Sequence, residues 1–384
     1  MAQRRVSKFA ALTTLRARWS IFLFAGLALI VIGNRFLRQV PFAAENVWLV
    51  IAGLAFVWQS LFFFVDLSKN EPKDKKSLLP LFGIGTWLSL FRLLLLSLTA
   101  GFLFSPRPEG WLAWAPFGLY LVFNLTDLVD GYAARRWGQT TRLGEKLDLD
   151  LDSRGMLVGC LLAVQYGSAG WWYVSVGLAR YLFVVGMWIR KRLGLAAIEK
   201  PNPLSRPLAG LQMGVGTALL APVLHPPYTI LISTLVMIPF MGNFFYDWLV
   251  VSGSKQGHPY TRKQSKPSLF SPSIKKGLPL LFRGLVVVLL AYRVLSGEIT
   301  GTSLYIEIFL AAGLALGAGV RLLSLLLLIH VGLELRGQPP PGNELLLSLC
   351  GLAIVYLGPG LLSLWTPENS LIHRRLGEKA FNEN

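Results

Sequence analysis

Residues 125–155, LTDLVDGYAARRWGQTTRLGEKLDLDLDSRG, place five aspartates between two strongly apolar parts of the chain. Asp127 and Asp130 are three residues apart, and Asp148 and Asp152 are four residues apart. Side chains at these spacings share one face of an α-helix. Because the polar stretch between the two pairs is short, the sequence predicts two antiparallel helices whose carboxylates converge.

The rest of the chain has the composition of a membrane protein. Of its 384 residues, 53% are hydrophobic and only 15% are charged, whereas soluble domains carry about a quarter charged residues. The apolar residues are grouped in about twelve blocks of a length suited to crossing a bilayer. We therefore predict an all-α polytopic membrane protein with about twelve transmembrane helices.

The predicted membrane segments fall into three groups, which suggest the domain organisation. We expect an N-terminal basic segment with a two-helix anchor in residues 1–77 and a six-helix domain in residues 78–252. A basic linker in residues 253–276 and a four-helix domain with a tail in residues 277–384 follow. The Lys, Pro and Ser content of the two basic stretches is typical of exposed connectors.

The positive charge of the chain bears on its partners and its topology. A net charge of +17 would indicate nucleic-acid binding in a soluble protein. Here the basic residues lie in every second loop between apolar blocks, which is the pattern of cytoplasmic loops. We predict no nucleic-acid partner, cytoplasmic termini and a cytoplasmic aspartate cluster. This topology requires a break in the last apolar region at Gly317–Arg321. A signal peptide ending near PFAAE, residues 41–45, is a minor alternative.

The aspartates are candidate ligands for metal ions. Carboxylates that converge near a membrane need positive partners. Oxygen ligands with no neighbouring His or Cys favour Mg²⁺ or Mn²⁺, and a pair of such ions is a recurrent solution for phosphoryl chemistry. The predicted ligands of two divalent ions are Asp127, Asp130, Asp148 and Asp152. The neighbouring Arg135, Arg136 and Arg142 are suited to phosphate binding.

The whole stretch resembles the signature of the CDP-alcohol phosphatidyltransferase family. The family pattern D-x2-D-G-x2-A-R-x8-G-x3-D-x3-D is matched at every fixed position. These positions are Asp127, Asp130, Gly131, Ala134, Arg135, Gly144, Asp148 and Asp152. The resemblance implies a six-helix membrane bundle over about residues 78–250. It also implies transfer of a substituted phosphate from a CDP-linked alcohol to an acceptor hydroxyl, with release of CMP.

The resemblance also implies roles for individual residues. Asp127, Asp130 and Asp148 would bind metal, and Asp152 would complete the second metal site or act as the catalytic base. Asp152 lies one turn beyond Asp148 on the same helix face, which suits a base that reaches an incoming hydroxyl. The CDP pocket would be formed by Asp130, Gly131, Ala134, Arg135, Thr141 and Gly144.

Weaker likenesses flank the signature and concern the acceptor. TWLSLFR, residues 86–92, retains the arginine of the family pattern N-x-x-T-x-x-R. KPNPLSRPLAGLQ, residues 200–212, resembles a block of the glycerophosphate-accepting and cardiolipin-synthase-like members, with an arginine in place of lysine. The basic residues predicted at the acceptor site are Arg92, Arg142, Arg180 and Arg206. They favour an anionic acceptor, such as a phosphorylated polyol or a phospholipid headgroup.

The last predicted group, about residues 278–370, resembles DoxX-type four-helix membrane proteins. The resemblance rests on Glu307, Gly313, Gly317 and Arg321 and on the ending GPGLLSL. It implies a fold but no activity. We expect Glu307 and Arg321 to form a structural ion pair, because charges inside a membrane need partners.

The preferred interpretation is an enzyme of phospholipid biosynthesis in a prokaryotic plasma (inner) membrane. Its partners would be CDP-diacylglycerol as donor, an acceptor alcohol and membrane lipids, and a homodimer is compatible with the sequence. The same signature also serves transfer from a soluble CDP-alcohol to diacylglycerol. A non-enzymatic transporter or channel with the aspartates as its permeation site is a further alternative, although no inverted repeat supports it.

Overall fold

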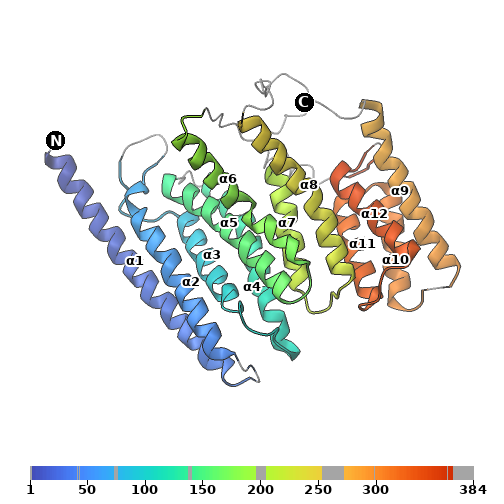
Figure 1. The fold of residues 1–384 in the computed structure, drawn as a ribbon, viewed down its shortest axis with the longest axis horizontal. Helices are drawn as coiled ribbons and strands as arrows, with labels where there is room; N and C mark the ends of the chain where they lie inside the picture. The colour runs from blue at the N-terminus through green and yellow to red at the C-terminus, as the bar shows by residue number, and fades with distance from the viewer. Residues whose placement is uncertain are drawn as a thin grey trace. The chain divides into compact units, whose positions relative to one another are not determined.

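The computed structural model describes most of the chain. The described residues are 2–40, 42, 44–72, 77–136, 141–195, 205–252, 272–297, 299–360 and 362–365. Among them, the side chains of residues 2–8, 128–136, 205–206 and 272–276 are not described. Over these residues the chain forms twelve α-helices, three short 3₁₀ helices and no strand (Figure 1). The predicted all-α fold class is confirmed.

The helices are named here in the order of the chain. They are α1 (Ala2–Leu37), α2 (Glu45–Val65), η1 (Leu67–Lys69), α3 (Ile84–Ala100), η2 (Gly110–Ala113), α4 (Trp114–Arg136), α5 (Arg142–Gln165), η3 (Trp171–Tyr173), α6 (Val174–Arg192), α7 (Ser205–Leu220), α8 (Tyr228–Val251), α9 (Pro272–Leu295), α10 (Thr302–Leu316), α11 (Val320–Leu335) and α12 (Gly342–Leu357). The aspartate-rich stretch forms the end of α4 and the start of α5, as its spacing predicts.

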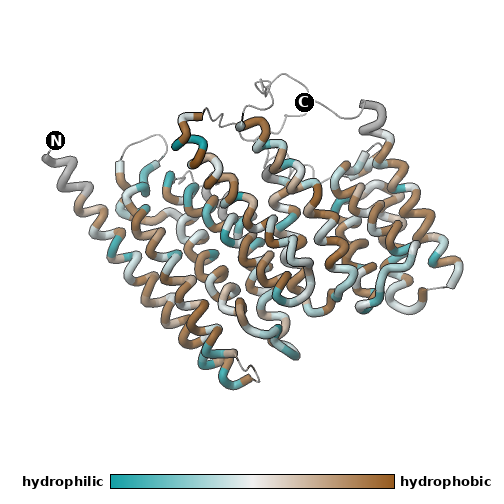
Figure 2. Tube along the Cα trace, in the orientation of Figure 1, coloured by the Kyte–Doolittle hydropathy of each residue, from teal (hydrophilic) through white to brown (hydrophobic). Residues whose placement is uncertain are grey.

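Several helices have the properties of membrane spans. Five are long and apolar enough to cross a bilayer: Phe9–Leu37, Glu45–Val65, Trp171–Arg192, Tyr228–Val251 and Gly277–Leu295. Hydrophobic residues run along α1 and α2, for example (Figure 2). Four other apolar helices are shorter. The structure thus supports an integral membrane protein, and the number of about twelve spans stays a prediction.

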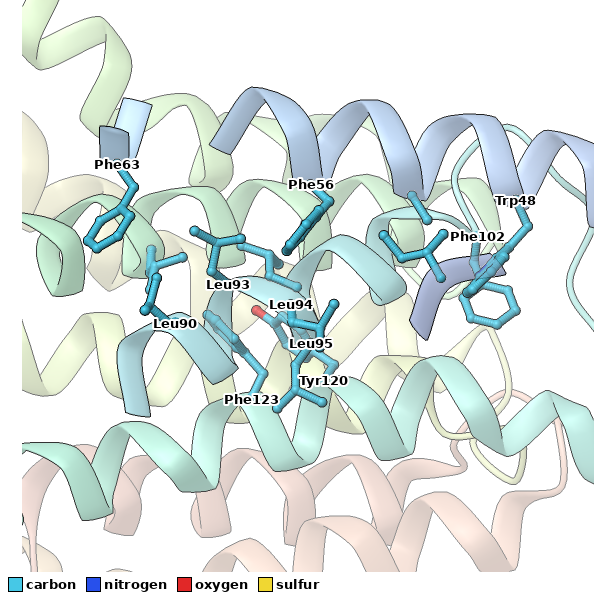
Figure 3. Close-up of a cluster of buried hydrophobic side chains, with 14 of the residues drawn as sticks. Trp48, Phe56, Phe63, Leu90, Leu93, Leu94, Leu95, Phe102, Tyr120 and Phe123 are labelled. Carbon is cyan, nitrogen blue, oxygen red and sulfur yellow. The ribbon is translucent and has the colours of Figure 1, made fainter. Parts of the chain in front are cut away.

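The chain forms two compact units. The first comprises Met1–Leu182 and Gln212–Pro222, and the second comprises Phe183–Leu211 and Val223–Asn384. At the centre of the first unit, α3 packs against α2, α4 and α5. Phe56 of α2, Leu90 and Leu93 of α3 and Phe123 of α4 are completely buried together (Figure 3). In a bilayer, such close packing is a main force that holds helices together.

Two glycines set the contact between α4 and α5. A Cβ atom at Gly155 would lie 2.5 Å from the Phe123 ring, and one at Gly159 would lie 2.6 Å from the Tyr120 hydroxyl. Larger residues would therefore push the two helices apart. The Tyr120 hydroxyl also donates a hydrogen bond of 3.0 Å to the Gly155 carbonyl. These contacts join α4 to α5 one to two turns away from the aspartates.

The second unit contains the four helices α9–α12, in which α9 packs against α10 and α12 and α11 packs against α10 and α12. The helix break predicted at Gly317–Arg321 is present, because Gly317 and Gly319 adopt left-handed conformations between α10 and α11. The predicted ion pair of Glu307 with Arg321 is wrong. Glu307 pairs instead with Arg293 of α9, at 3.1 Å, and with His330 of α11, at 3.5 Å.

The physical reason for this correction lies in the bundle's packing. Arg293 lies near the end of α9 and also pairs with Glu344 in the first turn of α12, at 2.9 Å. Arg321 lies in the first turn of α11, and its Nε donates to the Val355 carbonyl of α12. A buried charge needs a partner close to it. The packing of the helices brings Arg293 of α9, and not Arg321 of α11, to Glu307 of α10.

Candidate active site

The start of α5 is fixed by a helix cap. Thr141 has an extended backbone, and its buried hydroxyl accepts a hydrogen bond of 3.1 Å from the Gly144 backbone N–H. A threonine cap satisfies one of the free N–H groups of the first helical turn. Thr141, which the resemblance assigns to the CDP pocket, therefore also defines where the aspartate-bearing helix begins.

Three of the four predicted metal ligands converge. Asp127 of α4 and Asp148 and Asp152 of α5 each offer a carboxylate oxygen, and these oxygens all lie within 4.8 Å of one another. Their side chains are partly exposed, at 16%, 44% and 37%. The cluster is therefore accessible to a ligand, while the helices that carry it are packed against each other.

Arg92 of α3 lies against the same three carboxylates. Its Nη1 is 2.6 Å from Asp148 Oδ1 and 3.1 Å from Asp127 Oδ1, and its Nη2 is 2.7 Å from Asp152 Oδ1. The arginine is completely buried, and its guanidinium lies 4.8 Å from the centre of the Phe123 ring. A buried arginine needs such partners. The sequence assigned Arg92 to acceptor binding, and the structure places its guanidinium on the aspartates.

The charges of the cluster bear on metal binding. Three carboxylates face one guanidinium here, so the acidic groups outnumber their positive partner. The donors are all carboxylate oxygens, the type that Mg²⁺ and Mn²⁺ prefer. A carboxylate has two oxygens and about four lone-pair directions, so an aspartate can accept from Arg92 and ligate a metal at once. The residues present thus fit a divalent ion.

The remaining predicted site residues are placed less completely. Gly144 lies in the first turn of α5. A Cβ atom at this position would lie 3.6 Å from the Thr86 hydroxyl oxygen. Arg142 is exposed at the start of α5, and Arg180 is half-buried in α6. The backbone of α4 and α7 is described for a further group of residues, but their side chains lie outside the described part. This group is Asp130, Gly131, Ala134, Arg135 and Arg206.

The sequence analysis missed two residues near the cluster. Lys146, two residues before Asp148, pairs with Asp66 at the end of α2. Asp66 begins a polar stretch with the composition of an exposed connector, so the neighbouring sequence does not indicate a contact with α5. The pairing depends on how the N-terminal helices pack against α5, which the order of residues alone does not show.

Comparison with known proteins agrees with the motif. Residues 82–245 match the model of the CDP-alcohol phosphatidyltransferase family. A CDP-diacylglycerol–glycerol-3-phosphate 3-phosphatidyltransferase of Escherichia coli (strain K12) is 34% identical over 94 residues, which cover 24% of this chain and 48% of that protein. The protein of the same name from Sodalis glossinidius (strain morsitans) is 38% identical over 93 residues, covering 23% and 48%.

The relatives match only part of the chain. The chain spans about half the length of the curated relatives it matches. No solved structure matches it. The three aspartates of the cluster, Asp127, Asp148 and Asp152, all lie within the family match. The cluster and its arginine therefore belong to a region, residues 82–245, that matches the CDP-alcohol phosphatidyltransferase family.

Proposed function

We propose that this protein is an integral-membrane CDP-alcohol phosphatidyltransferase of phospholipid biosynthesis. It transfers a phosphatidyl group from CDP-diacylglycerol to an acceptor hydroxyl and releases CMP. The observation that carries the proposal is the convergence of Asp127, Asp148 and Asp152 within the region that matches the family. The names of the matched relatives, which are CDP-diacylglycerol-dependent phosphatidyltransferases, support the choice of donor.

The reaction is a displacement at phosphorus. The acceptor oxygen bonds to the phosphorus that carries the diacylglycerol, and the bond from this phosphorus to the bridging pyrophosphate oxygen breaks. CMP leaves with the electron pair, and the proton of the acceptor hydroxyl passes to a base. When bound, two Mg²⁺ or Mn²⁺ ions would neutralise the pyrophosphate and the charge that develops on the leaving group.

The proposal assigns metal binding, proton transfer and positioning to different residues of this chain. Asp127, Asp130 and Asp148 hold the metal ions, and Asp152 takes the proton of the acceptor hydroxyl. Arg92 orients Asp152, since its Nη2 lies 2.7 Å from Asp152 Oδ1. Because Arg92 is completely buried, we assign it to positioning the carboxylates rather than to direct acceptor binding.

The substrate pockets are also part of the proposal. The residues proposed for the CDP moiety are Asp130, Gly131, Ala134, Arg135, Thr141 and Gly144. Those proposed for an anionic acceptor are Arg142, Arg180 and Arg206. The relatives are named for glycerol 3-phosphate, a phosphorylated polyol, which supports an anionic acceptor for this chain.

The setting of the enzyme follows from the same reasoning. We propose a prokaryotic plasma (inner) membrane, with about twelve spans and with the site and both termini on the cytoplasmic side. The bacterial origin of the relatives and the basic alternate loops support this topology. The domain boundaries at residues 77, 252 and 276, the DoxX-like character of the last four helices and a homodimer stay proposals.

The test is a screen with purified protein in detergent or in lipid vesicles. CDP-diacylglycerol is combined with candidate acceptors, including glycerol 3-phosphate, uncharged polyols and phospholipids, and CMP release is measured with Mn²⁺ or with a chelator. We expect metal-dependent CMP release with an anionic acceptor. CMP release only from a soluble CDP-alcohol with diacylglycerol would reverse the donor assignment. No CMP from any combination would refute the proposal.

A further inference from the structure

The segment between α2 and α3 contacts the start of the aspartate-bearing helix. Residues 66–72, called the strap here, lie before the region that matches the family. The Glu71 carbonyl accepts a hydrogen bond of 3.0 Å from the backbone N–H of Arg142. Pro72 and Thr141 form an isolated antiparallel bridge. The strap thus pairs with the chain where α5 begins.

The strap is also tied to α5 by charge. Asp66, which is 8% exposed, binds the Lys146 ammonium group and lies 2.6 Å from the Lys69 ammonium group. Lys146 belongs to α5, whereas Lys69 belongs to the strap itself. The pair with Lys146 therefore connects two segments, and the pair with Lys69 does not.

The strap has a defined conformation of its own. Asn70 is completely buried, and its side-chain amide donates hydrogen bonds of 3.0 Å to the carbonyls of Leu79 and Leu81. The Leu79 N–H donates to the Asn70 carbonyl at 2.9 Å. Leu67 is buried in the core of the first unit. The strap is therefore part of the packed structure, although its composition is that of an exposed connector.

The preceding helix continues the contact along α5. The Arg154 guanidinium lies 5.0 Å from the centre of the Trp58 ring and 5.5 Å from that of Phe62, both on α2. The hairpin of α1 and α2 is in turn joined to the core, because Gln59 donates a 3.0 Å hydrogen bond to Ser97 of α3. Trp19 of α1 donates to the Ser60 carbonyl of α2 at 2.9 Å.

These contacts hold α5 on the face opposite Asp148 and Asp152. At 3.6 residues per turn, Lys146 and Arg154 are about 80° apart around the helix, and Asp148 and Asp152 are about 40° apart. The centres of these two pairs are about 180° apart, so they lie on opposite faces. Arg92 binds the second face, and the strap and α2 bind the first. Both the rotation of α5 and its position along its axis are thereby fixed.

We propose that the strap and α2 are a positioning part of the active site, acting through Lys146 and the Arg142 N–H to align Asp148 and Asp152 with Asp127. The inference deepens the proposed function, on which it rests for its catalytic consequence. It assigns a role to the two N-terminal helices, which lie outside the family match and would otherwise serve as an anchor. Positioning of ligands by outer groups commonly changes metal affinity or activity by 10- to 100-fold.

The first experiment compares Lys146→Met with Lys69→Met. Each variant removes one lysine partner of Asp66, but only the first disconnects α5 from the strap. We expect Lys146→Met to weaken Mn²⁺ binding, measured without substrate, by about tenfold and to lower kcat by about tenfold with little change in KM. Lys146→Arg should restore both, and Lys69→Met should stay within about twofold of the original protein.

The second experiment compares Arg142→Pro with Arg142→Ala. Both remove the arginine side chain, but only proline removes the N–H that donates to Glu71. Position 142 begins α5, where proline is well tolerated, and the preceding Thr141 has the extended backbone that proline requires. We expect about tenfold weaker Mn²⁺ binding in the proline variant than in the alanine variant.

The outcomes separate this inference from the proposed function. Equal Mn²⁺ affinity of Lys146→Met and Lys69→Met, together with equal affinity of the two Arg142 variants, would overturn the positioning role. If the unmodified protein releases no CMP from any donor, the proposed function fails, but the Mn²⁺ comparison still decides whether the strap positions the carboxylates. If Lys146→Met does not fold, the Arg142 pair alone decides the matter.

Discussion

Arg92→Met is expected to destabilise the protein mainly when no metal is bound. The substitution keeps the length and apolar character of the side chain but removes the guanidinium that lies 2.6 to 3.1 Å from Asp148, Asp152 and Asp127. The three carboxylates then face one another with no positive group between them. A divalent ion would replace the lost charge, so saturating Mn²⁺ should restore most of the stability.

The size of the effect follows from burial. Removing one partner of a buried ion pair costs about 3–5 kcal/mol. Here the buried partner is the arginine itself, and the carboxylates left behind are 16% to 44% exposed and stay partly hydrated. We therefore expect the free energy of unfolding to fall by about 2–3 kcal/mol without metal and by less than about 1 kcal/mol with saturating Mn²⁺.

The assay is thermal or denaturant unfolding of the purified protein with Mn²⁺ and with a chelator. Arg107→Met is the matched control, since the Arg107 side chain donates to the carbonyls of Leu220 and Ala221 and lies over the Tyr166 ring. Within the described part of the chain it forms no ion pair with an aspartate. Its loss of stability should be the same with and without Mn²⁺. If Arg92→Met leaves metal-free stability unchanged and only raises the KM of the acceptor, Arg92 binds the acceptor and the positioning role is wrong.

Three further predictions concern other parts of the structure. Gly159→Ala should lower stability by about 1–3 kcal/mol, because its Cβ would lie 2.6 Å from the Tyr120 hydroxyl; Gly118→Ala, with nothing within 4 Å, should not, and equal unfolding temperatures would contradict this. Arg293→Met should cost about 3–5 kcal/mol, since the buried Glu307 and the partly exposed Glu344 lose their arginine, yet it should leave Mn²⁺ affinity unchanged. A normal unfolding transition would refute this prediction. Burial raises the pKa of Asp66, but hydrogen bonds from two lysines outweigh it and lower the pKa overall. Its stabilising effect is therefore present above the unfolded-state pKa of about 3.9 and is lost as the pH falls through the folded-state pKa. Asp66→Asn should thus be destabilised near neutral pH and match the original protein in strong acid, and an equal deficit at both pH values would exclude this origin.

The sequence was sufficient to predict the helices and the convergence of the aspartates. Long apolar blocks have few alternatives to membrane helices, and spacings of three and four residues place the carboxylates on one face of each helix. Because few residues separate the two aspartate pairs, an antiparallel arrangement of their helices is the simplest one. These features are local, which is why the end of α4 and the start of α5 were predictable.

Contacts between distant segments were not predictable in the same way. Arg92 lies 56 and 60 residues before the two aspartates to which it donates hydrogen bonds, and its partners depend on the packing of α3 against α4 and α5. The partner of Glu307 was misassigned because Arg293 and Arg321 are equally distant from it in sequence, 14 residues on either side. Only the packing of the helices shows which of the two arginines pairs with Glu307. The strap has a polar composition, and only the fold shows that Asn70 is buried.

The central claim is that the aspartate cluster transfers a phosphatidyl group, with separate roles for binding and proton transfer. The most direct measurement compares CMP release from CDP-diacylglycerol and nucleotide affinity, both with Mn²⁺, in Asp127→Ala and Asp152→Asn. Asp127→Ala should lose both properties through loss of metal. Asp152→Asn should bind nucleotide within about tenfold but release CMP more slowly by about 10²-fold or more. Full CMP release by Asp127→Ala with unchanged Mn²⁺ affinity would contradict the account, and so would normal turnover by Asp152→Asn.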